Sequence, residues 1–289
     1  MNGERKTIQL SYCTIEYEDT GGSGPVVVLL HGFLMDSSLW RGVIDSLASQ
    51  CRCVAPTLPL GAHRHPVRTD ADLSLRGIAR LVSEFLEALN LPAVTLVGND
   101  TGGALVQLLI CENSPRIGRA VLVSCDAFDN FPPRVSGQML VLTGRLPPAA
   151  FGAFMQQLRL RPVRRLPIAF GWLSRRGDPT TRRWLEQILT RPDIRRDTVR
   201  ALRTVPTEPK LLLEAAECLR TFDRPALVVW AKEDRIMPPD HGRRLNELLP
   251  HGRLVEIDDS YTLIPLDQPI RLAEAVGAFI READPATGA

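Results

Sequence analysis

Short apolar runs alternate along the chain with longer segments whose apolar residues recur at helical spacing. The run from Val26 to Leu30 is apolar throughout, which is typical of a strand buried on both faces of a parallel sheet. Residues 73–89 instead place apolar side chains three and four positions apart, as an amphipathic helix does. The pattern predicts strands at residues 7–19 (two short strands), 26–30, 52–58, 94–97, 120–124, 226–231 and 253–257, and helices at residues 37–49, 73–89, 104–110, 210–222, 239–249 and 269–281. Strands that alternate with helices indicate an α/β fold with a mostly parallel, doubly wound sheet.

The alternation stops after residue 128 and returns near residue 209. Residues 129–208 show no clear strand and contain helix-like pieces that are separated by prolines and rich in arginine. We therefore predict a helical cap at residues 129–208, inserted into a core formed by residues 1–128 and 209–289. The arginines could steer an anionic substrate toward the core, but arginines on short helices more often form a solvated face.

The composition is typical of a soluble globular protein. The 289 residues are 44% hydrophobic and 24% charged, with a formal net charge of +2. A charge so near zero provides no overall attraction to nucleic acid or to an anionic membrane, so we expect neither as a partner. The polar amino terminus and the lack of a membrane-length apolar run predict a cytoplasmic protein. The six cysteines lack metal-ligand and Cys-x-x-Cys spacing, so we expect buried free thiols, no metal and no cofactor, while the oligomeric state is not indicated.

Residues 94–103 combine a strand, a tight turn and the start of a helix around one acidic residue. Asp100 follows a β-branched run, and Gly98 and Gly102 lie two positions away on either side. This Gly-x-Asp-x-Gly pattern fits a nucleophile elbow, a sharp turn in which small neighbours let the backbone fold tightly. Asp100 would then point into the cleft above the sheet, near the amino end of the helix. The alternative is an ordinary connection in which Asp100 only caps the helix.

Four features, in this order, resemble the α/β-hydrolase superfamily over nearly the whole chain. They are His31-Gly32-Phe33 after an early strand, Gly98-Asn99-Asp100-Thr101-Gly102 at the turn, the helical insertion, and Trp230-Ala231-Lys232-Glu233-Asp234 followed by Pro238. An aspartate at the elbow is similar to the branch that includes haloalkane dehalogenases, fluoroacetate dehalogenases and epoxide hydrolases. The resemblance implies that the backbone N–H groups of Phe33 and Thr101 form an oxyanion hole, with Asn99 among the oxyanion or binding residues. It also implies that Asp234 is the acid of a catalytic triad.

The resemblance fails at the residue that should be the catalytic histidine. Within that branch a carboxylate attacks carbon, and a histidine then activates the water that hydrolyses the resulting ester. Aligned without a gap, residues 259–269 place Thr262 where this histidine belongs. Threonine does not titrate near neutral pH and cannot act as the base, so an ester formed at the elbow would tend to persist. His63 or His65, on a loop that should open on the same face, could supply a base; alternatively both are surface loop residues.

Other residues are further candidates for the site. His31 is expected to support the oxyanion loop by hydrogen bonding. Asp126 follows the strand after the elbow, a position from which some relatives provide the triad acid, although Asp234 matches more closely. Trp172 could line a pocket, but an aromatic residue at a helical position more often packs. Tyr261 is either a phenolic donor or fills the space that the imidazole left.

These observations support three hypotheses for the function. The first is a hydrolase-superfamily enzyme acting on a small organic molecule, with Asp100 as nucleophile or general base, that hydrolyses a carbon–halogen, epoxide or ester bond. The second is a lyase, isomerase or cyclase in which Asp100 transfers a proton, with its pKa raised in a dry pocket. The third is a non-catalytic small-molecule binding protein. Thr101 stands where haloalkane dehalogenases hold halide with a tryptophan, and the insertion lacks the tyrosines that epoxide hydrolases use, which weakens both of those assignments.

Overall fold

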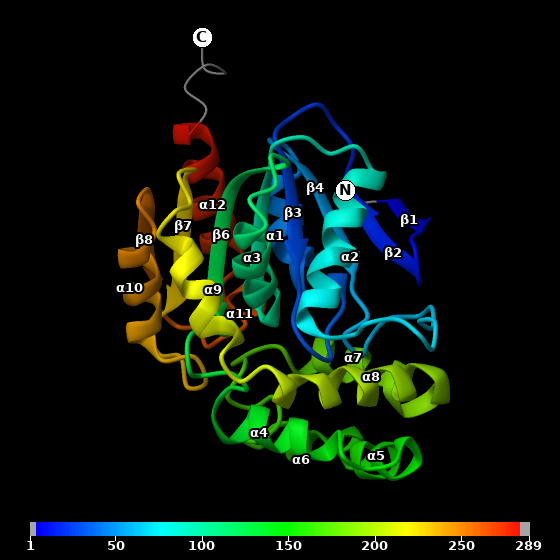
Figure 1. Cartoon of the computed structure of the whole chain (residues 1–289). Helices are drawn as coiled ribbons and strands as arrows, with labels where there is room; N and C mark the ends of the chain where they lie inside the picture. The colour runs from blue at the N-terminus through cyan, green and yellow to red at the C-terminus, as the bar shows by residue number, and fades with distance from the viewer. Residues whose placement is uncertain (1–3, 284–289) are drawn as a thin grey trace.

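The computed structural model describes residues 4–283, so the first three and last six residues of the predicted core lie outside it. Within that range a central eight-stranded sheet has the strand order β1-β2-β4-β3-β5-β6-β7-β8 (Figure 1). The strands are β1 (Glu4–Gln9), β2 (Thr14–Asp19), β3 (Val26–Leu30), β4 (Arg52–Thr57), β5 (Val94–Asp100), β6 (Ile117–Cys125), β7 (Ala226–Ala231) and β8 (Gly252–Ile257). β2 pairs antiparallel with β1 and with β4, whereas the other neighbours are parallel. The predicted α/β fold with a mostly parallel sheet is confirmed.

Helices cover both faces of the sheet, and an apolar cluster fills the space on each side. On one face lie α1 (Arg41–Leu47) and α12 (Pro269–Ala283), whose apolar residues share a cluster with η1 (Ser37–Trp40) and α11 (Ile264–Asp267). On the other face lie α2 (Leu75–Ala88), α3 (Thr101–Cys111), α9 (Leu211–Leu219) and α10 (Pro239–Leu248). Across residues 4–283, no helix combines the length and the apolar character that a bilayer-crossing segment needs.

The segment between β6 and α9 forms a separate layer of helices. Its described elements are α4 (Arg134–Thr143), α5 (Pro148–Met155), η2 (Gln156–Arg159), α6 (Arg161–Arg164), α7 (Asp178–Thr190), α8 (Pro192–Thr204) and η3 (Val205–Thr207). In Figure 1 this segment, which we call the helical insertion (residues 129–208), lies below the sheet, with α7 and α8 nearer the core than α4, α5 and α6. The indole N–H of Trp184 in α7 donates to Asp36 Oδ1 at 2.9 Å, and the Val67 N–H donates to Asp197 in α8 at 2.8 Å. These two hydrogen bonds attach the insertion to loops of the core.

One disulfide corrects the expectation that all six cysteines are free. Cys111, at the end of α3, is bonded to Cys218 in α9 across a sequence separation of 107 residues. The remaining cysteines are free and buried, as expected: Cys13, Cys51, Cys53 and Cys125. The pairing could not be recognised from spacing, because only the packing of α3 against α9 brings such distant positions together.

Candidate active site

Asp100 forms the whole turn between β5 and α3. The strand ends at this residue and the helix begins at the next one. Its backbone has φ 56° and ψ −129°, outside the regions that residues with a side chain ordinarily occupy. Gly102 packs so closely on β3 that a Cβ there would overlap the carbonyl oxygen of Leu30. This is the geometry of a nucleophile elbow, and the Asp100 side chain also caps α3, because it accepts a hydrogen bond from the Thr101 N–H.

A cavity of about 300 Å³ lies between the core and the helical insertion, and Asp100 forms part of its wall. Most of the lining is apolar and comes from the insertion, with Phe33 and Ile236 among the contributions of the core. Asp100 is the one titratable side chain among the described residues of this lining. The cavity therefore combines an extensive apolar wall with a single carboxyl.

The Asp100 carboxyl is buried and held by backbone donors. Its side chain belongs to a residue that is only 7% exposed, and the Thr101 N–H donates to Oδ1 at 2.7 Å. The Phe33 N–H also donates to the carboxyl, and a Cβ on Gly32 would overlap Oδ1. Burial raises the pKa of Asp100 to about 6, although these hydrogen bonds act in the opposite direction. At neutral pH the carboxyl is therefore mainly ionised, and a minor fraction of the molecules carries it protonated.

The Thr101 hydroxyl connects Asp100 to a second carboxyl. Thr101 Oγ1 is 3.1 Å from Asp100 Oδ1 and 2.9 Å from Asp126 Oδ2. A hydroxyl has one proton, so it can donate to one of these oxygens and must accept a proton from the other. Asp126 is fully buried, and burial together with the nearby charge of Asp100 raises the pKa of Asp126 well above its usual value. The arrangement that satisfies both contacts has a neutral Asp126 donating to Thr101, which donates to Asp100.

Asp234 and Thr262 form a second polar cluster, which contacts the end of β5 through Asn99. The Thr262 hydroxyl donates to Asp234 Oδ1 at 2.8 Å, and the same oxygen accepts the N–H groups of Ile236 at 2.9 Å and Met237 at 2.8 Å. Burial raises the pKa of Asp234 to about 6 against the effect of these hydrogen bonds. Asn99 is not part of the cavity lining; its Nδ2 donates to the Thr262 carbonyl at 2.8 Å. Asn99 therefore holds the Thr262 loop against β5.

Comparison with known proteins identifies the family. The sequence matches the family described as alpha/beta hydrolase fold over residues 25–269. The chain belongs to the α/β-hydrolase family. It is 26% identical over 275 residues to haloalkane dehalogenase 2 of Mycobacterium bovis, covering 91% of this chain and 90% of that protein. It is 25% identical over 282 residues to cis-3-alkyl-4-alkyloxetan-2-one decarboxylase of Xanthomonas campestris, covering 92% of each chain.

The fold is also similar to that of solved structures in this family. A thermophilic esterase from Thermogutta terrifontis superposes with a TM-score of 0.72 at 21% identity, covering 97% of this chain and 99% of that one. At this level of identity the likeness supports the fold alone. A shared fold does not determine the chemistry, which depends on the residues of the site itself.

None of the candidate histidines of this α/β-hydrolase lies in the described cavity lining. His31 donates from Nδ1 to the Gly32 carbonyl at 2.8 Å, and its Nε2 accepts a backbone N–H at 2.8 Å. Burial lowers the pKa of His31 to about 4, so the ring is neutral. His63 is buried against the insertion, with Nε2 3.7 Å from the Asp197 carboxylate, and His65 is half-buried on the same loop.

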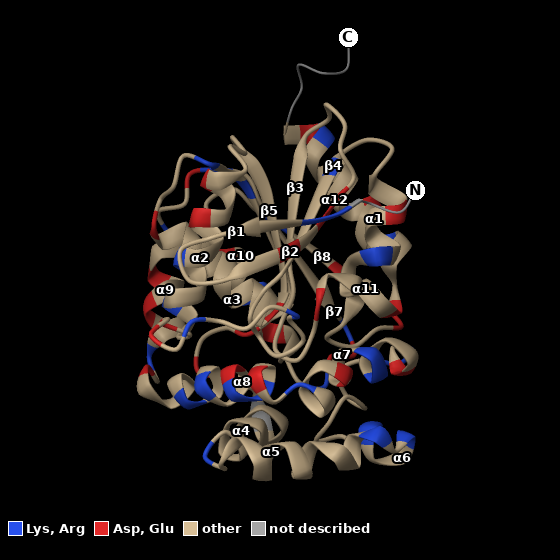
Figure 2. Ribbon diagram, turned by 90° about the vertical axis from the view of Figure 1, so that its right-hand side faces the viewer, with Lys and Arg blue, Asp and Glu red and all other residues tan. Residues whose placement is uncertain are grey.

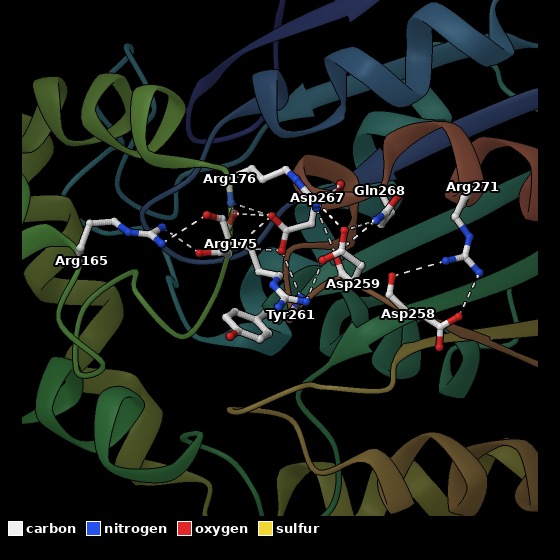
Figure 3. A network of polar contacts seen from close by, with 10 residues as sticks. Arg165, Arg175, Arg176, Asp258, Asp259, Tyr261, Asp267, Gln268 and Arg271 are labelled. Atoms are coloured by element: carbon white, nitrogen blue, oxygen red, sulfur yellow. Dashed lines mark hydrogen bonds and ion pairs between the residues drawn. The ribbon is translucent and has the colours of Figure 1, made fainter.

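Trp172 and Tyr261 also lie outside the described cavity lining. Trp172 is 38% exposed. Tyr261 is buried, and its ring centroid is 5.1 Å from the guanidinium carbon of Arg175 and 4.6 Å from that of Arg235. Figure 3 shows Arg175 beside this ring, within a polar network in which Asp267 accepts the Tyr261 N–H at 3.0 Å. This network connects the insertion to the loop after β8.

The apolar wall of the cavity was not among the residues expected from the sequence. Residues 139–141 of α4 all contribute to that wall. These three consecutive residues are apolar, so they extend beyond one face of the helix. Such a run indicates that the helix is covered on more than one side. The run does not specify what covers it, because that depends on how the insertion packs on the core.

Proposed function

We propose that this α/β-hydrolase is an enzyme that transfers a proton within a small, mainly apolar organic molecule, with Asp100 as acid and base, and without hydrolysis. The observation that carries the proposal is the composition of the cavity. Asp100 is the one titratable side chain in the described lining, and no histidine belongs to it. An isomerisation or elimination needs a group that accepts and releases a proton, and a carboxyl can do both.

Hydrolysis through an ester at Asp100 would need a second group that acts as a base. Thr262 stands where the resemblance predicts that base, and its hydroxyl donates to Asp234 at 2.8 Å. A threonine cannot accept a proton from water near neutral pH, so the water-activating step is missing. Proton transfer by Asp100 needs no such step. The relative that is named a decarboxylase is in keeping with a non-hydrolytic reaction in this family.

The environment of Asp100 supports a reversible proton transfer near neutral pH. Burial brings the pKa of Asp100 to about 6, close to the pH at which the group would work. In an isomerisation, ionised Asp100 removes a proton from one carbon and the electron pair shifts along the substrate. Asp100 then returns the proton to a second carbon, so the carboxylate is regenerated. Neutral Asp126 stabilises the ionised form through the Thr101 hydroxyl, which lies 3.1 Å from Asp100 Oδ1.

Nucleophilic attack by Asp100 is the second candidate, and the backbone donors favour it. The N–H groups of Thr101 and Phe33 hold the carboxyl as an oxyanion hole would. A relative at 26% identity is named a haloalkane dehalogenase. In this reaction a carboxylate oxygen forms a bond to carbon, and the halide leaves with the electron pair of the broken bond. The ester would then persist, so the protein would react once.

Turnover and the mass of Asp100 distinguish the two candidates. The purified protein is incubated with 5-nitrobenzisoxazole, which opens to a coloured phenolate when a base removes its C–H proton. A second sample receives 1-bromohexane, which can alkylate a carboxylate. We expect repeated turnover of the benzisoxazole that falls at least about 100-fold in Asp100→Asn, the loss typical of a missing general base. We expect no mass gain on the peptide that contains Asp100.

Asp223→Asn is the matched control, because the Asp223 side chain is 86% exposed. It should keep the parent rate. A hexyl ester on Asp100 without benzisoxazole turnover would replace the proposal with the nucleophile. If neither reaction occurs and Asp100→Asn binds both compounds like the parent, the protein is a small-molecule binder instead.

A further inference from the structure

The outer helices of the insertion expose apolar side chains. Within the described part of the chain, eight of the ten exposed large apolar side chains lie between residues 135 and 172, and we call these eight the apolar patch. Val135 is 62% exposed, Leu142 51% and Leu160 63%. Val135, Met139 and Leu142 are spaced four and three positions apart, so they share one face of α4. Isolated exposed apolar residues are ordinary, but a concentration of this kind indicates a contact surface.

The segment that bears the patch carries arginines but no acidic residue of its own. Its partly compensating carboxylates come from outside it: Arg161 and Arg164 pair with Asp178, and Arg175 and Arg176 pair with Asp259. Residues 131–177 contain eight arginines and no lysine, aspartate or glutamate. The rest of the chain carries a formal net charge of −6, because it contains 27 basic and 33 acidic side chains. In Figure 2 the ribbons of α4, α5 and α6 accordingly show no red, and α6 is marked in blue. Arg145 and Arg159 are exposed and pair with no carboxylate of a described residue, so the overall charge of +2 conceals a local positive surface.

The cavity reaches the surface within the apolar patch. Met139, Phe154, Leu166 and Ile168 are exposed and also line the cavity. The path from the surface to Asp100 is therefore bordered by apolar side chains at its mouth. A lipophilic molecule that enters there contacts these apolar side chains before it reaches the Asp100 carboxyl.

We propose that this face docks on an anionic lipid bilayer, so that the mouth of the cavity opens toward the lipid. Exposed apolar side chains insert at the boundary between headgroups and acyl chains, while arginines bind the lipid phosphates. A second copy of the chain fits less well, because a two-fold contact through the same patch would bring the arginines of both copies together. The proposal replaces the expectation of no membrane partner, which was based on net charge, and it does not depend on the role of Asp100.

Vesicle sedimentation and tryptophan fluorescence test the docking. The full chain is mixed with vesicles of equal parts POPC and POPG, or of POPC alone. We expect at least about tenfold stronger binding to the POPG vesicles, and weaker binding when salt is raised from about 0.1 M to about 0.5 M. Trp172 is 38% exposed, whereas Trp40, Trp184 and Trp230 are at most 1% exposed. A blue shift of tryptophan emission on vesicle binding therefore reports on the patch.

Substitutions outside the cavity lining test the patch itself. Val135→Ser/Leu142→Ser/Leu160→Ser should weaken vesicle binding about tenfold, because it removes exposed apolar area. The matched control is Leu213→Ser/Ile270→Ser, at positions that are 42% and 63% exposed on other elements, and it should bind like the parent.

Further outcomes separate docking from the alternatives. Asp100→Asn should bind vesicles like the parent, so a failure of docking is distinguishable from a failure of the proposed catalytic role. Absence of binding to POPG vesicles, or an equal loss in the control pair, overturns the proposal. Light scattering that shows a dimer, converted to a monomer by the triple substitution, would assign the patch to a second copy of the chain.

Discussion

The burial of Asp100, the residue proposed to react, lowers the stability of the folded state. The pKa of Asp100 rises from 3.8 to about 6 on folding, mainly because burial disfavours the charged form. The folded state therefore binds its proton more tightly than the unfolded state does. Stability is unaffected below about pH 4, falls as the pH rises between the two pKa values, and remains lowered above pH 6.

Replacing the ionisable group should remove this penalty. Asp100→Asn should increase the free energy of unfolding at pH 7.5 by roughly 1–3 kcal/mol, since a shift of about two pKa units corresponds to about 3 kcal/mol. At pH 4 the gain should be close to zero. Urea unfolding at both pH values measures the difference, with exposed Asp223→Asn as the control. An equal gain at both pH values would contradict the ionisation assigned to Asp100.

We propose Thr262 as the position at which a water-activating base can be introduced. Its hydroxyl lies 2.8 Å from Asp234 Oδ1, so an imidazole at this position could donate to the same carboxylate. If 1-bromohexane alkylates Asp100 in the parent, Thr262→His should hydrolyse the ester and release bromide repeatedly, at least about tenfold faster than the parent, as general base catalysis contributes that much or more. Thr262→Val removes the hydroxyl without adding a base, and it should release no more than one bromide per protein. Equal release by the two variants would reject Thr262 as a position from which a base can act on the ester.

At the scale of elements, the sheet and the insertion make different contributions to the site. β5 pairs with β3 on one side and with β6 on the other, so it is a central strand. Asp100 lies at its end, directly before α3. The insertion supplies most of the apolar wall that faces this carboxyl. Its attachment through Trp184 and Asp197 consists of buried hydrogen bonds to the core. The core therefore positions the Asp100 carboxyl, and the insertion forms most of the wall around it.

At the scale of the whole molecule, the disulfide joins the two parts of the core that the insertion separates in sequence. Cys111 ends the helix that begins after Asp100, and Cys218 lies in the first helix after the insertion. The loop that the bond closes, with a sequence separation of 107 between its cysteines, contains the entire insertion. A loop of this length restricts the unfolded chain, so the bond should stabilise the fold.

Reduction should reveal this contribution. In guanidinium unfolding, a thiol reductant should lower the stability of the parent by about 2–4 kcal/mol, the usual range for a native disulfide. The double variant Cys111→Ser/Cys218→Ser should be as unstable without reductant as the reduced parent, and adding reductant should not change its stability. A parent protein whose unfolding is unchanged by reductant would show that the bond does not form in solution.

Local pattern was sufficient for the fold and for the position of the elbow. Apolar periodicity distinguishes strands from helices because burial repeats with the geometry of each element. The glycines around Asp100 indicate a sharp turn because a side chain at Gly102 would overlap β3. Phe33, Asp100 and Thr101 were candidates on sequence grounds, and all three belong to the cavity lining. Their chemical roles remain predictions.

Only the tertiary structure decided which distant residues meet. The contact of Thr101 with Asp126, the proximity of His63 to Asp197 and the bond between Cys111 and Cys218 join separate segments of the chain. No local pattern determines such contacts, because they depend on how helices pack across the sheet and the insertion. The sequence by itself determined the elements, the elbow and the absence of a histidine at position 262, whereas packing decided that the cavity around Asp100 contains no other titratable side chain among the described residues.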